Sequence, residues 1–375
     1  MPDALRIAFI GAGGVNFGGA EGPWDHATRL EALGGVTVSA VADPDTARAE
    51  RVLAARRAGA GGKMYAAAKV FGDFRAMLAA ARPQAVFIGV PPNAHGAAEP
   101  PKDVELACAA AGVHMFIEKP LACLPPEDMA PVAAALAEAA AGGLIVSVGY
   151  MFRYARAIDR MREILAEAGG ARAVIGRYDC AYSEIRKVEW WDVRQSGGPI
   201  VEQATHFVDL SRLLGGDAEI ASVRAVRIPA DSPAAGLADM PVLTDGRAGD
   251  EAVPAEFRAP RATAAVWRFA SGAVGSLTHG ALLHRQKYES ELEVWSDGLR
   301  LVLHDPYGRC RLSVRRPHDE ATETLDFADD DPYLTEDAAF LDAVRRGDAA
   351  GIRSSYADAM KTYELTWAIR RAAET

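Results

Sequence analysis

The first 150 residues alternate short apolar runs with alanine-rich helical stretches, and this alternation constrains the fold more than any other feature. Apolar runs of strand length occur at 5–11, 36–43, 85–90, 113–119 and 144–150. Helical stretches lie between them, at 25–33, 45–58, 73–81, 104–112 and 127–141. Strands that alternate with helices form a parallel sheet covered by helices. We therefore expect a doubly wound α/β domain of the Rossmann type over residues 1–150.

The chain changes character after a helical stretch at 153–170. Apolar and polar residues then alternate in segments at 173–185, 221–228, 262–270, 273–283, 288–297 and 299–305. Such alternation predicts an open, mostly antiparallel sheet with helices packed against it. Helices are also predicted at 335–347 and 354–374. We assign residues 151–375 to an α+β domain for substrate binding and oligomerisation, with a last helix able to pack back on the first domain.

One stretch fits neither predicted core. Residues 228–261 contain five prolines among small and acidic residues. Proline lacks a backbone donor and fixes its own φ, so such a stretch forms neither a helix nor a central strand. We expect an extended surface loop or flap between two strands.

Charge and cysteine usage exclude several classes of protein. The chain has 41 basic and 51 acidic side chains, a formal net charge of −10, which argues against a nucleic-acid or anionic membrane surface. No apolar run reaches the roughly 18 residues of a membrane span, and the start does not resemble a signal peptide. The four cysteines are scattered, which fits a reducing compartment. We expect a cytoplasmic protein with no metal site.

A glycine-rich turn follows the first predicted strand. Gly11 and Gly13 occupy the first two positions of the dinucleotide-binding pattern G-x-G-x-x-G, and Asn16 occupies the third. Asparagine tolerates a left-handed backbone better than most residues. A helix is expected from about Trp24, so the order of strand, turn and helix suits a pyrophosphate site. The alternative is an ordinary turn between a strand and a helix.

An acidic residue at the end of the second predicted strand supports the cofactor interpretation. Asp43 lies 27 residues beyond Asn16, where about 20 are usual, and residues 17–23 account for the difference as an insertion. A carboxylate there binds the ribose hydroxyls of NAD and repels the 2′-phosphate of NADP. No arginine is adjacent to Asp43. We predict NAD, with NADP as the alternative.

The predicted strand at 85–90 ends in a proline pair followed by His95, at the sheet edge where cofactors bind. His95 has a surface position as its alternative. The predicted cofactor contacts in these segments are Gly11, Gly13, Gly14, Val15, Asn16, Asp43, Pro91, Asn93 and His95.

With the motif EKPLA at 118–122, the pattern resembles the Gfo/Idh/MocA oxidoreductases, a family of NAD(P)-dependent enzymes. The resemblance extends over nearly the whole chain. It includes the glycine turn, ADPD at 42–45, GVPPNAHG at 89–96, GYMFRY at 149–154, SGGPIVEQATHFVDLSRLLGG at 196–216 and the closing helices. The resemblance implies that Glu118 and Lys119 contact the cofactor and that Lys119 and His206 act at the substrate. Glu202 stands where the family usually has Asp.

The residues also support this chemistry by themselves. A helix starting near Glu202 would place Glu202, His206 and Asp209 on one face, and Lys119 would follow a strand's carboxyl end, so that the groups could converge between the domains. We assign His206 as the base in alcohol oxidation, Lys119 as its electrostatic partner and Glu202 as a third catalytic group. Structural alternatives are a helix-start carboxylate for Glu202, a core histidine for His206 and a solvated strand-end lysine for Lys119.

Three further residues are predicted to bind substrate. Tyr150 and Arg153 lead into the connection between the domains, and Trp191 offers an indole on which a sugar ring could stack. A structural role is the alternative for each. Trp24 and His26 end the enlarged glycine loop, where they could cover the cofactor.

The resulting hypothesis is an NAD(P)-dependent dehydrogenase or reductase that transfers hydride at a hydroxyl or keto carbon of a sugar, cyclitol or similar polyol. Two alternatives remain: NAD-assisted glycoside cleavage or epimerisation without net redox change, and a non-catalytic NAD-binding regulator or scaffold. The strands around 265–280 offer a face for self-association, so we expect a homodimer or homotetramer.

Overall fold

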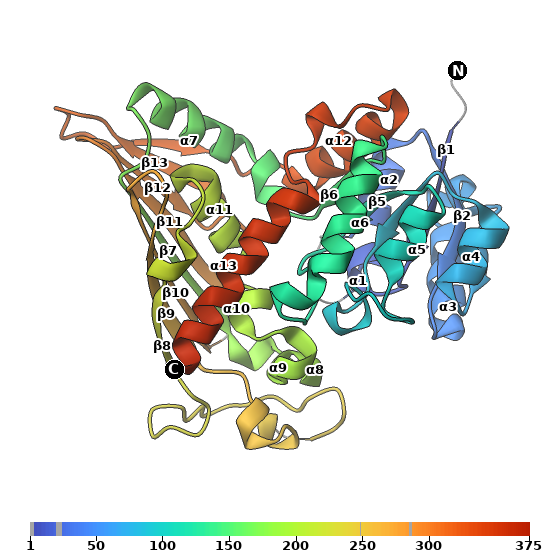
Figure 1. The fold of residues 1–375 in the computed structure, drawn as a ribbon, viewed down its shortest axis with the longest axis horizontal. Helices are drawn as coiled ribbons and strands as arrows, with labels where there is room; N and C mark the ends of the chain where they lie inside the picture. Colours follow the sequence, from blue (N-terminus) through green and yellow to red (C-terminus); the bar gives the residue numbers. More distant parts are fainter. Residues whose placement is uncertain (1–3, 20–24, 248, 285–286) are drawn as a thin grey trace. The chain divides into compact units, whose positions relative to one another are not determined.

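The computed structural model describes residues 4–19, 25–247, 249–284 and 287–375. Within it the chain forms two compact units (Figure 1). Unit 1 comprises residues 1–154 and 331–359, and unit 2 comprises residues 155–330 and 360–375. Unit 1 therefore contains a segment from the second half of the chain, residues 331–359, which carries the predicted helix at 335–347.

Unit 1 is built on a six-stranded parallel sheet with the order β3-β2-β1-β4-β5-β6. The strands are β1 (Leu5–Ile10), β2 (Val36–Ala42), β3 (Lys69–Phe71), β4 (Ala85–Ile88), β5 (His114–Ile117) and β6 (Val146–Val148). This is the Rossmann strand order, which places a ligand crevice at the carboxyl ends of the central strands. The expected doubly wound fold is confirmed. The short edge strand β3 was not predicted.

Several helices of unit 1 begin at an aspartate that caps their first turn. They are α1 (Gly14–Phe17), α2 (His26–Leu33), α3 (Thr46–Ala58), α4 (Phe74–Ala81), α5 (Val104–Ala110), α6 (Ala130–Ala141) and α12 (Pro332–Arg346). Asp25, Asp45 and Asp73 each accept a backbone N–H in the first turn of the helix that follows. Phe340 of α12 packs its ring edge-on against Phe87 and Phe116, so α12 belongs to this core. Trp24, the expected helix start, lies outside the described residues.

Unit 2 contains an eight-stranded sheet with the order β14-β13-β12-β11-β7-β10-β9-β8. The strands are β7 (Ala173–Ala181), β8 (Arg224–Ile228), β9 (Ala262–Arg268), β10 (Val274–Leu283), β11 (Tyr288–Trp295), β12 (Arg300–His304), β13 (Arg311–Arg315) and β14 (Glu323–Asp326). Among the described strands of this sheet, only β7 and β10 pair in parallel. The sheet is therefore mixed but mostly antiparallel, as expected. The edge strand β14 and its neighbour β13 were not predicted.

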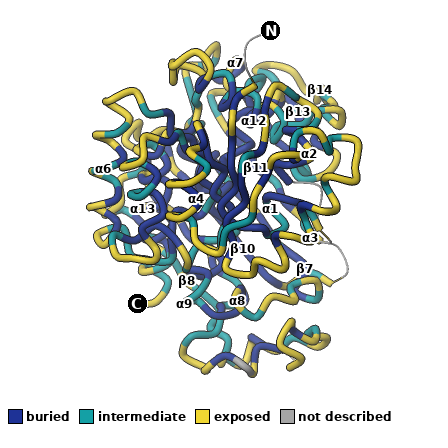
Figure 2. Tube along the Cα trace, turned by 90° about the vertical axis from the view of Figure 1, so that its right-hand side faces the viewer, coloured by how far each residue is buried: buried dark blue, intermediate teal, exposed yellow. Residues whose placement is uncertain are grey.

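The helices of unit 2 pack on one face of this sheet (Figure 1). They are α7 (Arg156–Glu167), α8 (Val188–Trp191), α9 (Val193–Ser196), α10 (Pro199–Glu202), α11 (Thr205–Gly215) and the larger part of α13 (Tyr356–Glu374). Phe207 of α11 contacts Tyr178 of β7 on that face. On the opposite face Val226, Val266 and Val274 remain exposed. Figure 2 shows where burial falls along the chain: buried residues are concentrated in the strands, and exposed residues in the connecting segments.

Residues 229–261 join β8 to β9. They contain single turns of 3-10 helix at Gly249–Ala252 and Ala255–Phe257 but no described strand. A loop between two strands was expected here. No helix within the described ranges combines the length and apolar character needed to span a bilayer.

Candidate functional site

The glycine turn after β1 approaches the end of β4 so closely that a side chain could not fit. Gly11 has a φ of 96°, and a Cβ there would lie 2.5 Å from the carbonyl oxygen of Gly89. By contrast, a Cβ on Gly14 would meet no heavy atom within 4 Å. Gly11 is therefore required by the fold, whereas Gly14 borders open space at the start of α1, where a pyrophosphate could approach the backbone.

Asn16 stabilises this turn through its side chain. It lies within α1, and its backbone is not among the positive-φ residues, so the left-handed conformation that asparagine tolerates is not used here. Its amide Nδ2 donates to the carbonyl oxygens of Gly11 at 2.7 Å and Ile10 at 3.2 Å. The side chain is completely buried, which places it behind the turn.

Asp43 ties the end of β2 to the glycine turn. Its carboxylate accepts the backbone N–H of Ala12 at 2.7 Å and that of Asp45 at 2.8 Å. Both carboxylate oxygens also accept from the guanidinium of Arg48, at 2.8 and 2.9 Å. No arginine is adjacent to Asp43 in sequence, and the contact with Arg48, five residues on, was not predicted. Its side chain is 47% exposed, so it is a cation at the position where a 2′-phosphate would be recognised.

The loop after β4 contains the predicted contacts Pro91, Asn93 and His95. A 3-10 turn at Pro92–Ala94 orders it. His95 is buried, and its Nδ1 lies 2.5 Å from the carboxylate of Glu105, which also accepts the N–H of Gly96. His95 thus holds the loop to α5 rather than presenting its ring to solvent.

Glu118, which follows β5, is held by a buried histidine. Nε2 of His26 lies 3.1 Å from Glu118, and Nδ1 of the same ring lies 2.8 Å from Asp337 on α12. Although burial alone lowers the pKa of His26, the carboxylates of Asp337 and Glu118 raise it to about 10. His26 is therefore a cation that joins α2, α12 and the EKP motif. The sequence suggested His26 only as a cover for the cofactor.

A third carboxyl group lies in the same cluster. Glu336 is 2% exposed, and its Oε1 has no hydrogen-bond partner within the described part of the chain. Burial, followed by the charges of Glu118 and Asp337, raises the pKa of Glu336 well above its usual value. Lys119 follows Glu118 directly and is half-buried at the carboxyl end of β5.

In unit 2 the helix that was expected to carry Glu202 and His206 together is interrupted. Glu202 is the last residue of α10, whereas His206 lies in the first turn of α11. The backbone N–H groups of Gln203 and Ala204 both donate to the carbonyl of Pro199, which resets the helix between them. The predicted i, i+4 relation of Glu202 and His206 is therefore wrong.

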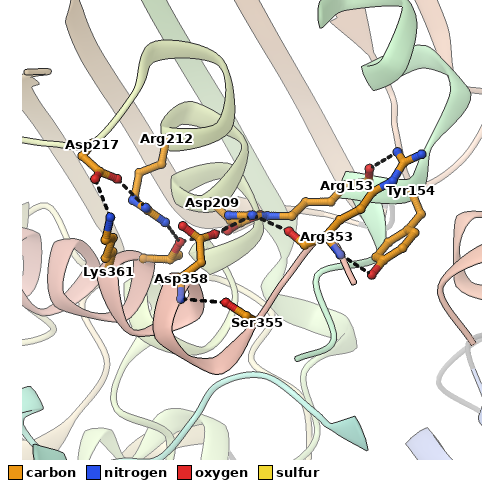
Figure 3. A network of polar contacts seen from close by, with 10 residues as sticks. Arg153, Tyr154, Asp209, Arg212, Asp217, Arg353, Ser355, Asp358 and Lys361 are labelled. Atoms are coloured by element: carbon orange, nitrogen blue, oxygen red, sulfur yellow. Dashed lines mark hydrogen bonds and ion pairs between the residues drawn. The ribbon is translucent and has the colours of Figure 1, made fainter. Parts of the chain in front are cut away.

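His206 and Asp209 do share α11, and both are buried. Asp209 accepts a hydrogen bond from the hydroxyl of Thr362 at 2.9 Å, and that hydroxyl accepts from Arg212 at 2.7 Å. Arg212 and Lys361 in turn bind Asp217 (Figure 3). This network fixes α11 against the last helix.

Glu202 has a defined partner in Trp190. The indole Nε1–H of Trp190 donates to Oε2 of Glu202 at 3.0 Å. Trp191, the predicted sugar platform, is instead completely buried, and its own indole N–H donates to the carbonyl of Ile185. Its environment is that of a core residue.

The other two predicted substrate contacts also lie in packed surroundings. Tyr150 is 1% exposed and Arg153 is 5% exposed. The guanidinium of Arg153 pairs with Asp358 at 2.5 Å and donates to the carbonyl of Arg353 at 2.7 Å (Figure 3). These contacts give Arg153 a structural role within unit 1.

A buried histidine for which the sequence predicted no role, His279, contacts Gln203, the residue that follows Glu202. His279 of β10 binds the Oε1 of Gln203 through its Nε2 at 2.9 Å, and the thiol of Cys180 donates to the same oxygen. Burial lowers the pKa of His279 to about 3, so the ring is neutral and donates to Gln203. His279 thus fixes the side chain of Gln203 in the break between α10 and α11.

A Rossmann sheet with a close glycine turn, and an acidic residue at the end of β2, defines unit 1 as the dinucleotide-binding part of an oxidoreductase. The family model described as oxidoreductase family, NAD-binding Rossmann fold, matches residues 5–150, and an oxidoreductase C-terminal domain model matches residues 153–299. The chain belongs to the Gfo/Idh/MocA family, and it is an NAD-binding oxidoreductase.

Three similar proteins illustrate this relationship. An uncharacterized protein of Schizosaccharomyces pombe is 38% identical over 98% of this chain and 91% of its own length. Inositol 2-dehydrogenase 4 of Saccharopolyspora erythraea is 28% identical over 64% of this chain and 62% of its own. Levoglucosan dehydrogenase, solved in complex with NADH and levoglucosan, has a TM-score of 0.74 at 18% identity, covering 99% of this chain and 97% of its own.

The residues of unit 1 fit the nicotinamide cofactor. The open space beside Gly14 suits a pyrophosphate, and the Asp43 carboxylate at the end of β2 suits a ribose diol. When bound, NAD supplies the hydride acceptor or donor of the reaction. The protein's own groups must then orient the substrate and move the hydroxyl proton.

Proposed function

We propose that this protein is a dehydrogenase or reductase that transfers hydride between NAD and a hydroxyl or keto carbon of a sugar, cyclitol or related polyol. The observation that carries the proposal is the glycine turn with Asp43 in an NAD-binding unit, in a chain that retains Lys119 and His206. The names of two similar proteins, inositol 2-dehydrogenase and levoglucosan dehydrogenase, favour a polyhydroxylated ring as substrate.

Each proposed catalytic group has a distinct task. His206 accepts the hydroxyl proton during oxidation and returns it during reduction, a task for which an imidazole suits neutral pH. The ammonium of Lys119 favours the negative charge that develops on the substrate oxygen. Glu202 binds a substrate hydroxyl through its carboxylate. Glu118 belongs to the cofactor side of the site, where His26 holds it.

The test is a spectroscopic assay with purified protein, NAD or NADP, and a panel of sugars, cyclitols and glycosides. We expect nucleotide reduction with at least one ring polyol. H206N and K119M should each lower kcat by a factor of about 10² to 10⁴ while calorimetry still detects NAD. H318N and K63M exchange exposed residues and serve as controls. Unchanged turnover in both site variants would contradict the assignment.

We also propose that the protein forms a homodimer or homotetramer. The exposed sheet face of unit 2 presents Val226, Val266 and Val274 on three neighbouring strands. A set of exposed apolar side chains on one face is suited to association with a second copy.

A further inference from the structure

Residues 229–261 contact Trp191, the neighbour of Trp190 before Glu202, and this arrangement carries an inference about substrate selection. We propose that Trp190 is a positioning residue that orients the Glu202 carboxylate, and that residues 229–261 hold Trp190 in place through Trp191. The inference rests on the proposed function, because it takes Glu202 as a group that binds a substrate hydroxyl.

The bond between Trp190 and Glu202 is the first step. Trp190 is 9% exposed and donates its indole N–H to Oε2 of Glu202 at 3.0 Å. A glutamate side chain has three rotatable bonds, so its carboxylate occupies many positions unless a partner fixes it. A hydrogen bond to an ionised carboxylate is both short and directional. Trp190 thereby determines which way the longer acidic side chain points.

The second step is the support of Trp190 by Trp191. The two rings meet edge to face with centroids 4.9 Å apart. Trp191 is completely buried, and its indole N–H is satisfied by the carbonyl of Ile185 at 3.0 Å. A ring that is buried on all sides and bonded at its nitrogen cannot change rotamer without unpacking.

The third step connects Trp191 to residues 229–261. The N–H of Ala259 donates to the carbonyl of Trp191 at 2.9 Å, and the guanidinium of Arg261 lies 5.5 Å from the indole centroid. Arg261 is itself buried, and it pairs with Asp250 at 2.7 Å and donates to the carbonyl of Ala235 at 3.1 Å. Arg261 thus connects Trp191 to two other positions of the segment, Ala235 and Asp250.

The consequence is chemical selectivity for the hydroxyl that Glu202 binds. A site built to hydrogen-bond one hydroxyl discriminates strongly against an isomer that lacks it there. If the carboxylate is released from Trp190, it can reorient to bind the hydroxyl of either isomer. The discrimination between the two isomers then falls. The segment therefore acts on specificity without contacting the reacting atoms.

The first experiment measures the bond itself and needs neither substrate nor nucleotide. The six tryptophans give indole ¹⁵N–¹H resonances, and W190F identifies that of Trp190. We expect E202Q to shift the Trp190 resonance and to leave that of Trp267, buried in β9, unchanged. An unchanged Trp190 resonance in E202Q would overturn the proposal whatever the substrate is.

The second experiment measures specificity with the polyol that gives turnover and its epimers. We expect W190F to raise KM more than it lowers kcat and to reduce the kcat/KM ratio between epimers about tenfold. W190F combined with E202Q should be no worse than E202Q alone, because Trp190 acts through Glu202. Additive losses, or an equal loss in the control W267F, would show that Trp190 only packs.

The third experiment tests the segment. R261M and D250N should each shift the Trp190 resonance and lower the epimer ratio toward that of W190F. R247M is the matched control, since it breaks the exposed pair of Arg247 and Asp245 within the same segment. If R261M fails to fold, D250N decides alone. A normal epimer ratio in a folded D250N protein would contradict the support role.

If no polyol is turned over, the proposed function fails. The resonance shifts still report on whether residues 229–261 support Trp190 through Trp191.

Discussion

Glu336 is a carboxyl group that the fold buries beside two other carboxyl groups, those of Glu118 and Asp337, and the His26 ring contacts both of these. An isolated buried carboxylate is so unfavourable that the group stays protonated instead. The protonated acid is retained in the folded state at pH values where the unfolded chain has lost its proton. The stability of unit 1 must therefore depend on pH through this residue.

We expect E336Q to stabilise the protein at neutral pH. The pKa of Glu336 is raised in the folded state, so its contribution is complete below its ordinary value near 4.5 and declines as pH rises. The decline is about 1.4 kcal/mol per pH unit. The gain in unfolding free energy of E336Q should thus be near zero at pH 4.5 and grow toward pH 7. Chemical denaturation at several pH values measures it, with the exposed-site variant E364Q as control. A gain that does not change with pH would contradict the burial argument.

We expect cofactor choice also to depend on single residues, Asp43 and Arg48. Replacing the carboxylate by D43S removes the repulsion of a 2′-phosphate and releases the Arg48 guanidinium. We expect the ratio of NADP to NAD affinity to rise at least about tenfold, and D43S/R48A to lose that gain. Titration calorimetry with both nucleotides measures the ratio. R48A alone should retain the preference for NAD, and an unchanged ratio in D43S would sink the assignment.

The residues that the sequence predicted best are those whose role is local. Gly11 and Asp43 follow predicted strands, and the structure brings them together as strand order requires. The His26 contacts bridge 92 and 311 residues of sequence, and no periodicity links such positions. Arg48 was missed for a simpler reason, because it lies one helical turn beyond the adjacent positions that were considered.

At the scale of elements, the glycine turn separates what the fold needs from what the ligand needs. A methyl group at Gly11 would clash with the Gly89 carbonyl, whereas one at Gly14 would enter open space. We expect G11A to destabilise the ligand-free protein by about 1–3 kcal/mol. G14A should leave its melting temperature nearly unchanged but weaken NAD binding about tenfold or more.

Thermal melts with and without NAD distinguish these two effects, since at a fixed ligand concentration a weaker ligand raises the melting temperature less. G351A adds a methyl group to open space at a surface turn of unit 1 and is the control. A G14A protein that gains as much thermal stability from NAD as the wild type would show that the pyrophosphate lies elsewhere.

The elements that sequence analysis missed share a physical cause. Strand β3 has three residues at a sheet edge, β13 is a five-residue strand with an arginine at each end, and β14 has no buried residue, so none has a long apolar pattern. The break between α10 and α11 contains Gln203 and Ala204, which carry no helix-stop signal. Local backbone hydrogen bonds to Pro199 form the break, and the Gln203 side chain is held by the distant residues Cys180 and His279, which is a tertiary effect.

At the scale of the whole molecule, we expect the exposed face of the eight-stranded sheet to decide whether the chain associates with a second copy. Val226, Val266 and Val274 are 70%, 53% and 54% exposed on adjacent strands, while the helices cover the opposite face. We expect the protein to have a mass of at least twice 39.8 kDa in dilute solution. A pair of glutamates in V266E/V274E would place charge where a second copy packs and should yield the monomer.

Light scattering coupled to size-exclusion chromatography measures this mass directly. The matched control is V242E, which places the same charge on an exposed valine of residues 229–261, away from the sheet. It should keep the oligomer intact. A wild-type mass near 39.8 kDa, or equal dissociation of V242E, would mean that this sheet face is not an interface between copies. Because association buries the face in the folded state only, the monomeric variant should also melt at lower temperature than V242E at equal concentration.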